Sequence, residues 1–356
     1  MFYLGLTNLL FLLRYALLGR NKARVQVYYP VLIALFLFSA FRYAVGCDWY
    51  GYYNQFNAAQ NFDWATLTSI REPVWWAVLA LINEASLPYP VVNVVSSAVF
   101  FAGVHQLAKR QPDPLAFLVL LFPILIINMP MSGIRQGAAI GLMCVAFIQF
   151  GDRRALGFTL WTLFAATFHV SAAVFLALTP LVGGKFTQVR VLLALVLAVP
   201  GVYFLATGES LDIATSRYIT SGIDAAGALF RLMMLALTSA FFLLVLRRKW
   251  SRLWPTDYRL VVFGSLAMAF TLALLPVSSV VGDRFGYYLI PIQAVMFARL
   301  PYLSLGPSSK VYVVLPYLGL LLVFAVWSQL SWHFQQCYVP YQTWLFGFPT
   351  GDPIGI

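Results

Sequence analysis

The chain has 356 residues, of which 61% are hydrophobic, 17% are aromatic and only 10% are charged. Soluble domains carry about 25% charged residues, so this composition excludes a soluble enzyme, and the aromatic content excludes a disordered chain. The apolar residues form long continuous blocks, which exclude an outer-membrane barrel of short alternating strands. A polytopic α-helical membrane protein remains, with 23 Lys and Arg, 12 Asp and Glu, and a net charge of +11.

Twelve apolar blocks follow one another along the chain, and a helix needs about 20 apolar residues to cross a bilayer. A further short block, 73–87, is broken by Asn83, Glu84 and Pro88, and we expect a half-helix that enters the membrane and returns. The stretch 155–182 is short for two crossings and fits a re-entrant pair. The predicted fold class is an all-α polytopic membrane protein, a single domain over residues 1–356. The expected crossings, about 12, are 2–18, 27–44, 91–107, 115–129, 137–150, 155–168, 170–182, 191–206, 229–246, 260–278, 285–298 and 311–327.

The charges divide between alternate connecting segments. One set holds 17 Lys and Arg with three acids, a net charge of +14, and the positive-inside rule makes this set cytoplasmic. The opposite set has six arginines, no lysine and nine acids, a net charge of −3. It comprises outer loops near 45–90, 128–136, 206–228 and 279–285 and an outer tail, 329–356. Because guanidinium binds phosphate in a bidentate manner, these arginines suggest an anionic substrate, although each could instead pair with an outer acid. They are Arg42, Arg71, Arg135, Arg217, Arg231 and Arg284.

The first outer loop combines a carboxylate with aromatic rings. Asp48 is followed by Trp49, Tyr50 and Tyr53. Aromatic faces pack against sugar rings, and a carboxylate accepts hydroxyl hydrogen bonds or acts as a base, so this pattern is typical of a sugar site. The alternative is an interfacial aromatic belt with a solvated acid. Later in the loop, Glu72 stands at the start of the half-helix, where it could act as an acid of the site. The alternative is ordinary helix capping, because proline follows at the first helical position.

Further candidates stand at predicted helix ends. Arg135 starts a helix after Pro130 and Gly133, and a helix N-terminus beside an arginine is an anion site. His169 lies at a helix end, where a structural role is the alternative. Arg284 is at another outer helix start, and Arg217 lies in a loop long enough to form a lid.

Signatures of metal and nucleotide sites are missing from the sequence. It contains no HExxH or CxxC spacing and no Walker or Rossmann pattern, so no metal, cofactor or nucleic-acid partner is predicted. A cation site to which Asp48 contributes stays open as an alternative. The three cysteines, Cys47, Cys144 and Cys337, have no paired spacing and predict neither a disulfide nor a metal site.

Six short motifs occur in order between about residues 40 and 341, and together they resemble the EpsG family of exopolysaccharide and O-antigen (Wzy-type) polymerases. Singly they are weak, but all six fall on one predicted membrane face. They are Phe41-Arg42 with Val45-Gly46-Cys47-Asp48-Trp49-Tyr50 and Tyr53, Arg71-Glu72-Pro73, Arg135-Gln136, Phe168-His169 with Ser171-Ala172, Arg284-Phe285 with Tyr287-Tyr288, and Tyr338 with Pro340-Tyr341.

This resemblance implies a multi-pass glycosyltransferase of GT-C-like architecture in the bacterial inner membrane. Such polymerases transfer a growing glycan from undecaprenyl diphosphate onto a lipid-linked repeat unit at the periplasmic face. The expected partners are the undecaprenyl-diphosphate-linked oligosaccharide, membrane lipid and a chain-length regulator. Two alternatives stay open. An O-antigen ligase-type glycosyltransferase is also rich in arginine, whereas a flippase or transporter of lipid-linked oligosaccharide is disfavoured because the charges lie at helix ends on one face.

Candidate roles follow from these residue types. Asp48 is the first choice of base, with His169 and Glu72 behind it. For the diphosphate, the first choices are Arg135 and Arg284, followed by Arg217, Arg42 and Arg71. The predicted sugar-binding residues are Trp49, Tyr50, Tyr53, Tyr288 and Tyr341.

Overall fold

The computed structural model describes residues 1–184, 187–207, 227–276, 278–306 and 309–349. Within these ranges the regular elements are helices, apart from an isolated bridge between Arg42 and Thr343. The main helices are α1 (Phe2–Ala16), α2 (Asn21–Ala40), α3 (Trp49–Ala58), α4 (Pro73–Glu84), α5 (Val91–Ala108), α6 (Pro114–Leu121), α7 (Ile134–Gly151), α8 (Ala155–Phe168), η4 (Val170–Leu181), α9 (Gln188–Thr207), α11 (Ala228–Phe241), α12 (Arg247–Leu253), α13 (Tyr258–Ala273), α14 (Ser279–Arg299), α15 (Ser309–Leu330) and α16 (Trp332–Tyr338). Short helical segments are η1 (Ala59–Asn61), η2 (Trp64–Thr68), η3 (Phe122–Ile126), η6 (Phe242–Leu246) and η7 (Leu300–Tyr302).

Five helices of the described chain are long and apolar enough to cross a membrane, and six more are apolar but shorter. Large apolar side chains on several of them face outward, for example Leu244 at 85% exposure and Leu322 at 66%. Soluble proteins rarely expose so much apolar surface, whereas lipid covers it. The prediction of an all-α multi-pass membrane protein is therefore confirmed, and the number of about twelve crossings stays a prediction. The five long helices are Asn21–Ala40, Val91–Ala108, Ile134–Gly151, Ala228–Leu253 and Lys310–Leu330.

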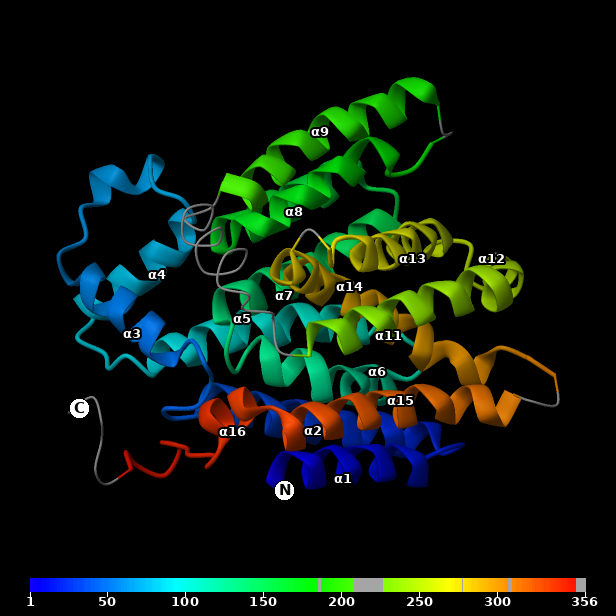
Figure 1. Cartoon of the computed structure of the whole chain (residues 1–356), viewed down its shortest axis with the longest axis horizontal. Helices are drawn as coiled ribbons and strands as arrows, with labels where there is room; N and C mark the ends of the chain where they lie inside the picture. Colours follow the sequence, from blue (N-terminus) through cyan, green and yellow to red (C-terminus); the bar gives the residue numbers. More distant parts are fainter. Residues whose placement is uncertain (185–186, 208–226, 277, 307–308, 350–356) are drawn as a thin grey trace.

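The helices are stacked in layers, with α1, α2 and α15 on one side, α5, α6, α7 and α14 in the middle, and α8, η4 and α9 on the other side (Figure 1). The middle layer carries the core, and most of α14 is buried along its length. Two glycines let α5 and α7 approach closely. A Cβ on Gly103 would lie 1.8 Å from the carbonyl oxygen of Gly141. Such small-residue contacts are a common way to pack helices in membranes.

The stretch 155–182 forms a helical hairpin, and its two arms differ in geometry. The first arm, α8, has 14 residues in an α-helix and rises about 21 Å. The returning arm, η4, is a 3₁₀-helix of 12 residues, and its steeper rise gives about 24 Å. The arms lie side by side, with Thr159 Oγ1 3.1 Å from Thr179 Oγ1. His169 lies at the tip of the hairpin, between the two arms.

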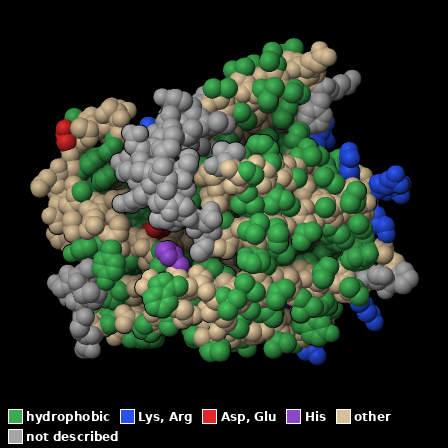
Figure 2. Space-filling view, in the orientation of Figure 1, with side chains coloured by type: hydrophobic (Ala, Val, Ile, Leu, Met, Phe, Trp, Pro, Cys, Tyr) green, Lys and Arg blue, Asp and Glu red, His purple; other side chains and the backbone are tan. Residues whose placement is uncertain are grey.

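Lys and Arg side chains gather at the end of the bundle where α12 lies, away from α3, α4 and α16 (Figures 1 and 2). The three acids assigned to the cytoplasmic side are all paired there. Asp113 accepts from Arg14 at 3.0 Å and from Arg24, and the other pairs are Asp152 with Arg110 at 3.1 Å and Asp257 with Arg299 at 2.6 Å. We call the end of the bundle where these Lys and Arg side chains gather the basic end. The opposite end is formed by α3, α4 and α16.

Two expectations differ from the structure. The prediction that the cysteines form no disulfide was wrong, because Cys47 and Cys337 are disulfide-bonded. They are 290 residues apart in sequence, so only the fold brings them together. Residues 279–285, expected as a loop, are the first turns of α14, which begins at Ser279. The expected outer loop 206–228, with Arg217, lies almost wholly outside the described residues.

Candidate active site

A cavity of about 690 Å³ opens at the end of the bundle opposite the basic end. Its wall is assembled from the starts of α3, α7 and α14, the tip of the α8–η4 hairpin, the start of α11 and the helix α16. Substrate-sized pockets have volumes of roughly 300–1,000 Å³, so this cavity is large enough for part of a glycan or a diphosphate. Its charged wall residues are Asp48, Arg135, Arg231, Asp283 and Arg284, joined by His169 and His333.

Glu72 connects three elements behind this wall. It stands before α4 with a left-handed φ of 59°. Its Oε2 accepts a hydrogen bond from Nη1 of Arg135 at 2.6 Å. Its Oε1 accepts from the backbone N–H of Val170 at 3.0 Å and lies 3.1 Å from Nδ1 of His169. One carboxylate therefore holds α4, the start of α7 and the hairpin tip together.

The two acid–base groups of this cluster, Glu72 and His169, differ in charge. Burial alone would raise the pKa of Glu72, but the contacts with His169, Arg135 and the Val170 N–H outweigh it and lower the pKa to about 2. Burial lowers the pKa of His169, assisted by Arg135 and Arg284 and opposed by Glu72, so the imidazole is neutral at neutral pH. An ionised carboxylate only accepts hydrogen bonds. Its position 3.1 Å from Nδ1 of His169 therefore favours the tautomer with the proton on Nδ1 and the lone pair on Nε2.

Two arginines reach the cavity from different helix starts. Arg135 is the second residue of α7, its guanidinium lies 5.5 Å from the Tyr52 ring centroid, and its buried Nε has no hydrogen-bond partner within the described residues. Arg284 is exposed to the cavity from α14. Gln136 Nε2 donates to the backbone oxygen of Arg284 at 2.5 Å, which ties the two helix starts together. Both guanidinium groups lie where an anion could enter.

Asp48 lines the cavity and receives a long hydrogen bond, 3.4 Å, from Ser132 Oγ. Arg42 supports this region from behind. It is 1% exposed, and its Nε donates to the carbonyl oxygens of Val45 at 3.0 Å and Met131 at 2.8 Å. Arg42 therefore joins the turn before Asp48 to the turn before α7, and it does not line the cavity.

A second buried ion pair forms another part of the wall. Arg231 Nε and Nη2 donate to the two carboxylate oxygens of Asp283 at 2.8 and 2.7 Å. The guanidinium also lies 5.5 Å from the Tyr287 ring centroid and 5.9 Å from that of Trp327. Charge counting placed Arg231 on the outer face, but it gave the residue no role in the site. Arg231 and Asp283 carry opposite charges and both stand near outer helix starts, and this pattern in the sequence could have predicted that they pair.

The predicted sugar-binding aromatics and Arg71 do not line the cavity. Trp49 is 1% exposed and packs against Tyr43 and Tyr89, while Tyr50 is 53% exposed outside the cavity. Arg71 is exposed just before Glu72. The others pack within the fold: Tyr53 against Tyr89, Tyr288 through its hydroxyl 2.9 Å from Ser171 Oγ, and Tyr341 stacked on Phe38. The aromatic side chains on the cavity wall are Tyr52, Tyr287, Trp327, Phe334 and Tyr338.

Comparison with known proteins identifies a family. The model of the EpsG family matches residues 26–343, which is nearly the whole chain. No match was found among curated proteins or solved structures.

Proposed function

The chain belongs to the EpsG family, and we propose that it is a bacterial polysaccharide polymerase that transfers a growing glycan from undecaprenyl diphosphate onto a lipid-linked repeat unit. The family supports a polymerase-type glycosyltransferase in a membrane. The donor, the acceptor, the GT-C-like architecture and the twelve crossings belong to the proposal. The observation that carries it is the contact of Glu72 with both Arg135 and His169 beside the cavity.

The orientation of the cavity is part of this proposal. Lys and Arg gather at the opposite end of the bundle, and such residues face the cytoplasm in inner-membrane proteins. The Cys47–Cys337 disulfide borders the cavity, and disulfides persist in oxidising compartments such as the periplasm. Both observations favour a cavity that opens to the periplasm, where lipid-linked repeat units are displayed.

We assign the diphosphate to Arg135 and Arg284. Negative charge develops on the diphosphate as the glycosyl bond breaks, and preorganised guanidinium groups stabilise that charge in the transition state. The start of α7 adds to this, because its capping residue, Gly133, provides no side-chain oxygen to compete with an anion. Arg217 stays a proposed lid contact outside the described residues, while Arg42 and Arg71 are not included because they do not line the cavity.

We assign the base to His169 in place of the first sequence choice, Asp48. The acceptor hydroxyl oxygen attacks the anomeric carbon, the bond from that carbon to the diphosphate oxygen breaks, and the hydroxyl proton passes to Nε2 of His169. Glu72 has too low a pKa to serve as an efficient base and instead orients the imidazole. Asp48 accepts a long hydrogen bond from Ser132, and we assign it to binding the hydroxyl groups of the acceptor sugar.

The substitution Arg135→Ala tests this function in a strain that lacks the chromosomal gene. We expect polymer to fall by about 10²–10³-fold, because one charge-stabilising donor is lost, and single repeat units to accumulate. Arg110→Ala, which removes an arginine at the basic end, is the matched control and should leave chain length unchanged. Normal chain lengths from Arg135→Ala at equal membrane levels would contradict the proposal.

The same strains separate the two alternatives. Full-length polymer that stays on its lipid carrier would identify a ligase-type enzyme. Repeat units confined to the cytoplasmic leaflet would identify a flippase.

A further inference from the structure

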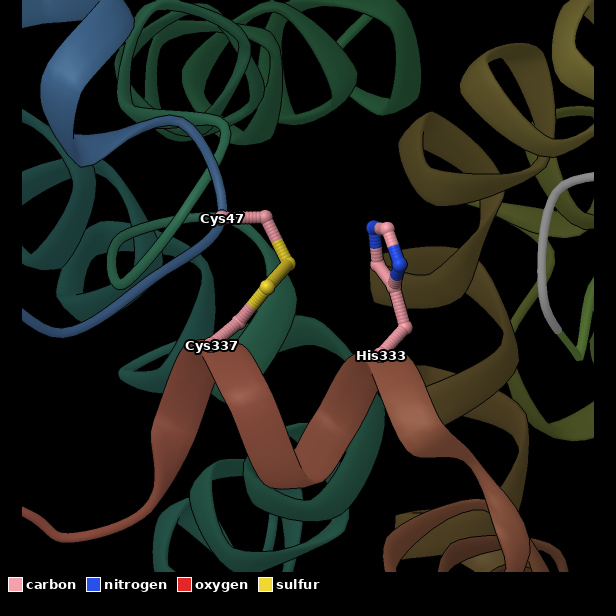
Figure 3. Close-up of side chains that lie close together, drawn as sticks. All are labelled: Cys47, His333 and Cys337. Atoms are coloured by element: carbon pink, nitrogen blue, oxygen red, sulfur yellow. A yellow bond between two sulfur atoms is a disulfide. The ribbon is translucent and has the colours of Figure 1, made fainter.

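Three potential metal ligands meet beside the cavity, and two of them, Cys47 and His333, line its wall. Cys47 lies in the turn before α3, and His333 and Cys337 lie one turn apart on α16. Their ligand atoms all lie within 4.8 Å of one another. Figure 3 shows His333 and Cys337 projecting from the same side of α16, with Cys47 reaching toward them from the neighbouring segment. In the structure the two sulfur atoms form a disulfide.

The two segments are held together by contacts that do not involve sulfur. The backbone N–H of Gly46 donates to the carbonyl oxygen of Cys337 at 2.7 Å, and the N–H of Tyr43 donates to the carbonyl oxygen of Gln342 at 2.9 Å. The hydroxyl of Tyr3 in α1 donates to the carbonyl oxygen of Tyr338 at 2.8 Å. Because these hydrogen bonds fix the backbone on both sides of the cluster, breaking the disulfide leaves the three side chains near one another.

We propose that the reduced form of this cluster binds one thiophilic metal cation, and Zn²⁺ is the cation used to test this. Thiolate and imidazole are the ligands that such cations prefer, and Cys₂His with an open fourth position is a known zinc arrangement. His333 and Cys337 are spaced i, i+4 on one helix, which places both on the same face. The oxidised cluster offers no thiolate, so the cysteine redox state decides whether the site exists.

The chemistry balances in two steps. A phosphine reductant gives two electrons to the disulfide and becomes the phosphine oxide with an oxygen from water, while the two sulfurs become thiols. Zn²⁺ then replaces the two thiol protons and binds Cys47 Sγ, Cys337 Sγ and an imidazole nitrogen of His333. Because the cation replaces two protons, the net charge of the wall beside Asp48 does not change, and the cation adds an open coordination position there. If the proposed function holds, this position lies beside the substrate cavity.

Zinc stoichiometry tests the site without any assay of transfer. Purified full-length protein is compared in its oxidised form and after reduction by phosphine and anaerobic desalting, using Zn²⁺ with a competing chromophoric chelator. We expect one Zn²⁺ per reduced chain and none above background for the oxidised chain. Cys337→Ser should remove binding, and His333→Ala should weaken it at least about tenfold, since even supporting groups around a metal contribute 10–100-fold.

Cys144→Ser is the matched control, because Cys144 is a buried free thiol outside the cluster and its loss should leave zinc binding unchanged. The proposal is overturned if reduced wild-type protein binds no more Zn²⁺ than Cys337→Ser. It is also overturned if reduction alone unfolds the chain, since the backbone contacts would then not hold the ligands together. Either failure would leave the polymerase proposal untouched, because polymer formation does not enter the measurement.

Discussion

Glu72 has the densest set of charged contacts among the residues of the candidate site. It is ionised and buried, it accepts hydrogen bonds from Arg135 and from the backbone N–H of Val170, and it lies 3.1 Å from Nδ1 of His169. Glu72, Arg135 and His169 could be selected from the sequence because each stands at a predicted helix end on the outer face. Their contact could not be read from the sequence, because Arg135 and His169 are 63 and 97 residues from Glu72 and only the packing of α4, α7 and the hairpin joins them.

The predicted sugar-binding aromatics of the first outer loop, Trp49, Tyr50 and Tyr53, do not line the cavity, because the segment that carries them is the helix α3. Because α3 is helical, residues at i, i+3, i+4 and i+7 share a face. Asp48, Gly51, Tyr52 and Gln55 follow this spacing and line the cavity, whereas Trp49 lies outside that set and is buried in the fold. The spacing was present in the sequence and would have selected Tyr52.

Glu72→Gln should change the pH dependence of transfer as well as its rate. The base must be neutral, so activity is lost as the pH falls through the pKa of His169. Glu72 raises that pKa, and without its charge the pKa falls, so the acid limb should move to lower pH while the maximal rate drops. The rate of polymerisation by purified protein across pH measures both effects.

Asp48→Asn is the control for this experiment. It should reduce the rate but leave the acid limb in place. An unmoved limb in Glu72→Gln, or a limb that moves only in Asp48→Asn, would return the base assignment to Asp48.

Gly46 is a second residue whose identity follows from geometry. Its φ is +103°, and a Cβ there would lie 1.9 Å from the carbonyl oxygen of Met131. Gly46→Ala should therefore lower the thermal midpoint of the purified protein, since backbone must move. Gly19→Ala is matched for positive φ, at +82°, but its Cβ meets nothing within 4 Å, so it should cost only about 1 kcal/mol of strain. Equal midpoints for the two variants would show that the close approach is absent.

At the scale of elements, the sequence predicted the apolar blocks well and their geometry poorly. The half-helix expected at 73–87 is the 12-residue α4, which rises only about 18 Å. The stretch 155–182 was correctly seen as tight, but a long 3₁₀ arm could not be anticipated, since such runs are uncommon. This arm lets 12 residues return from His169 to the far end of α8, so the base candidate lies at the hairpin tip.

The contact between α5 and α7 gives a prediction at this scale. A Cβ on Gly141 would lie 2.6 Å from Cα of Phe100, so Gly141→Ala should push the helices apart and destabilise the protein by about 1–3 kcal/mol. Gly5→Ala, in α1, meets nothing within 4 Å and should be neutral or slightly stabilising, because alanine favours helix. Thermal midpoints in one detergent compare the two, and an unchanged midpoint for Gly141→Ala would contradict the close packing.

For the whole molecule, the division of charge was the most useful feature of the sequence. It separated a strongly basic set of segments from an outer set of arginines and acids, and Lys and Arg do gather at one end of the bundle. The cavity and the disulfide lie at the other end. The disulfide could not be read from spacing, because its partners meet only when the C-terminal helix α16 packs beside the turn that follows α2.

Transfer by the purified protein tests the proposed polymerase activity directly. Full-length protein is reconstituted in lipid and supplied with a synthetic polyprenyl-diphosphate-linked repeat unit, and the products are separated by length. We expect a ladder of products from the wild type and a loss of about 10²–10⁴-fold in His169→Ala, the range for removal of a general base. If His169→Ala forms the same ladder at the same rate, His169 is not the base. If folded wild-type protein binds the substrate and forms no ladder, the polymerase assignment is contradicted.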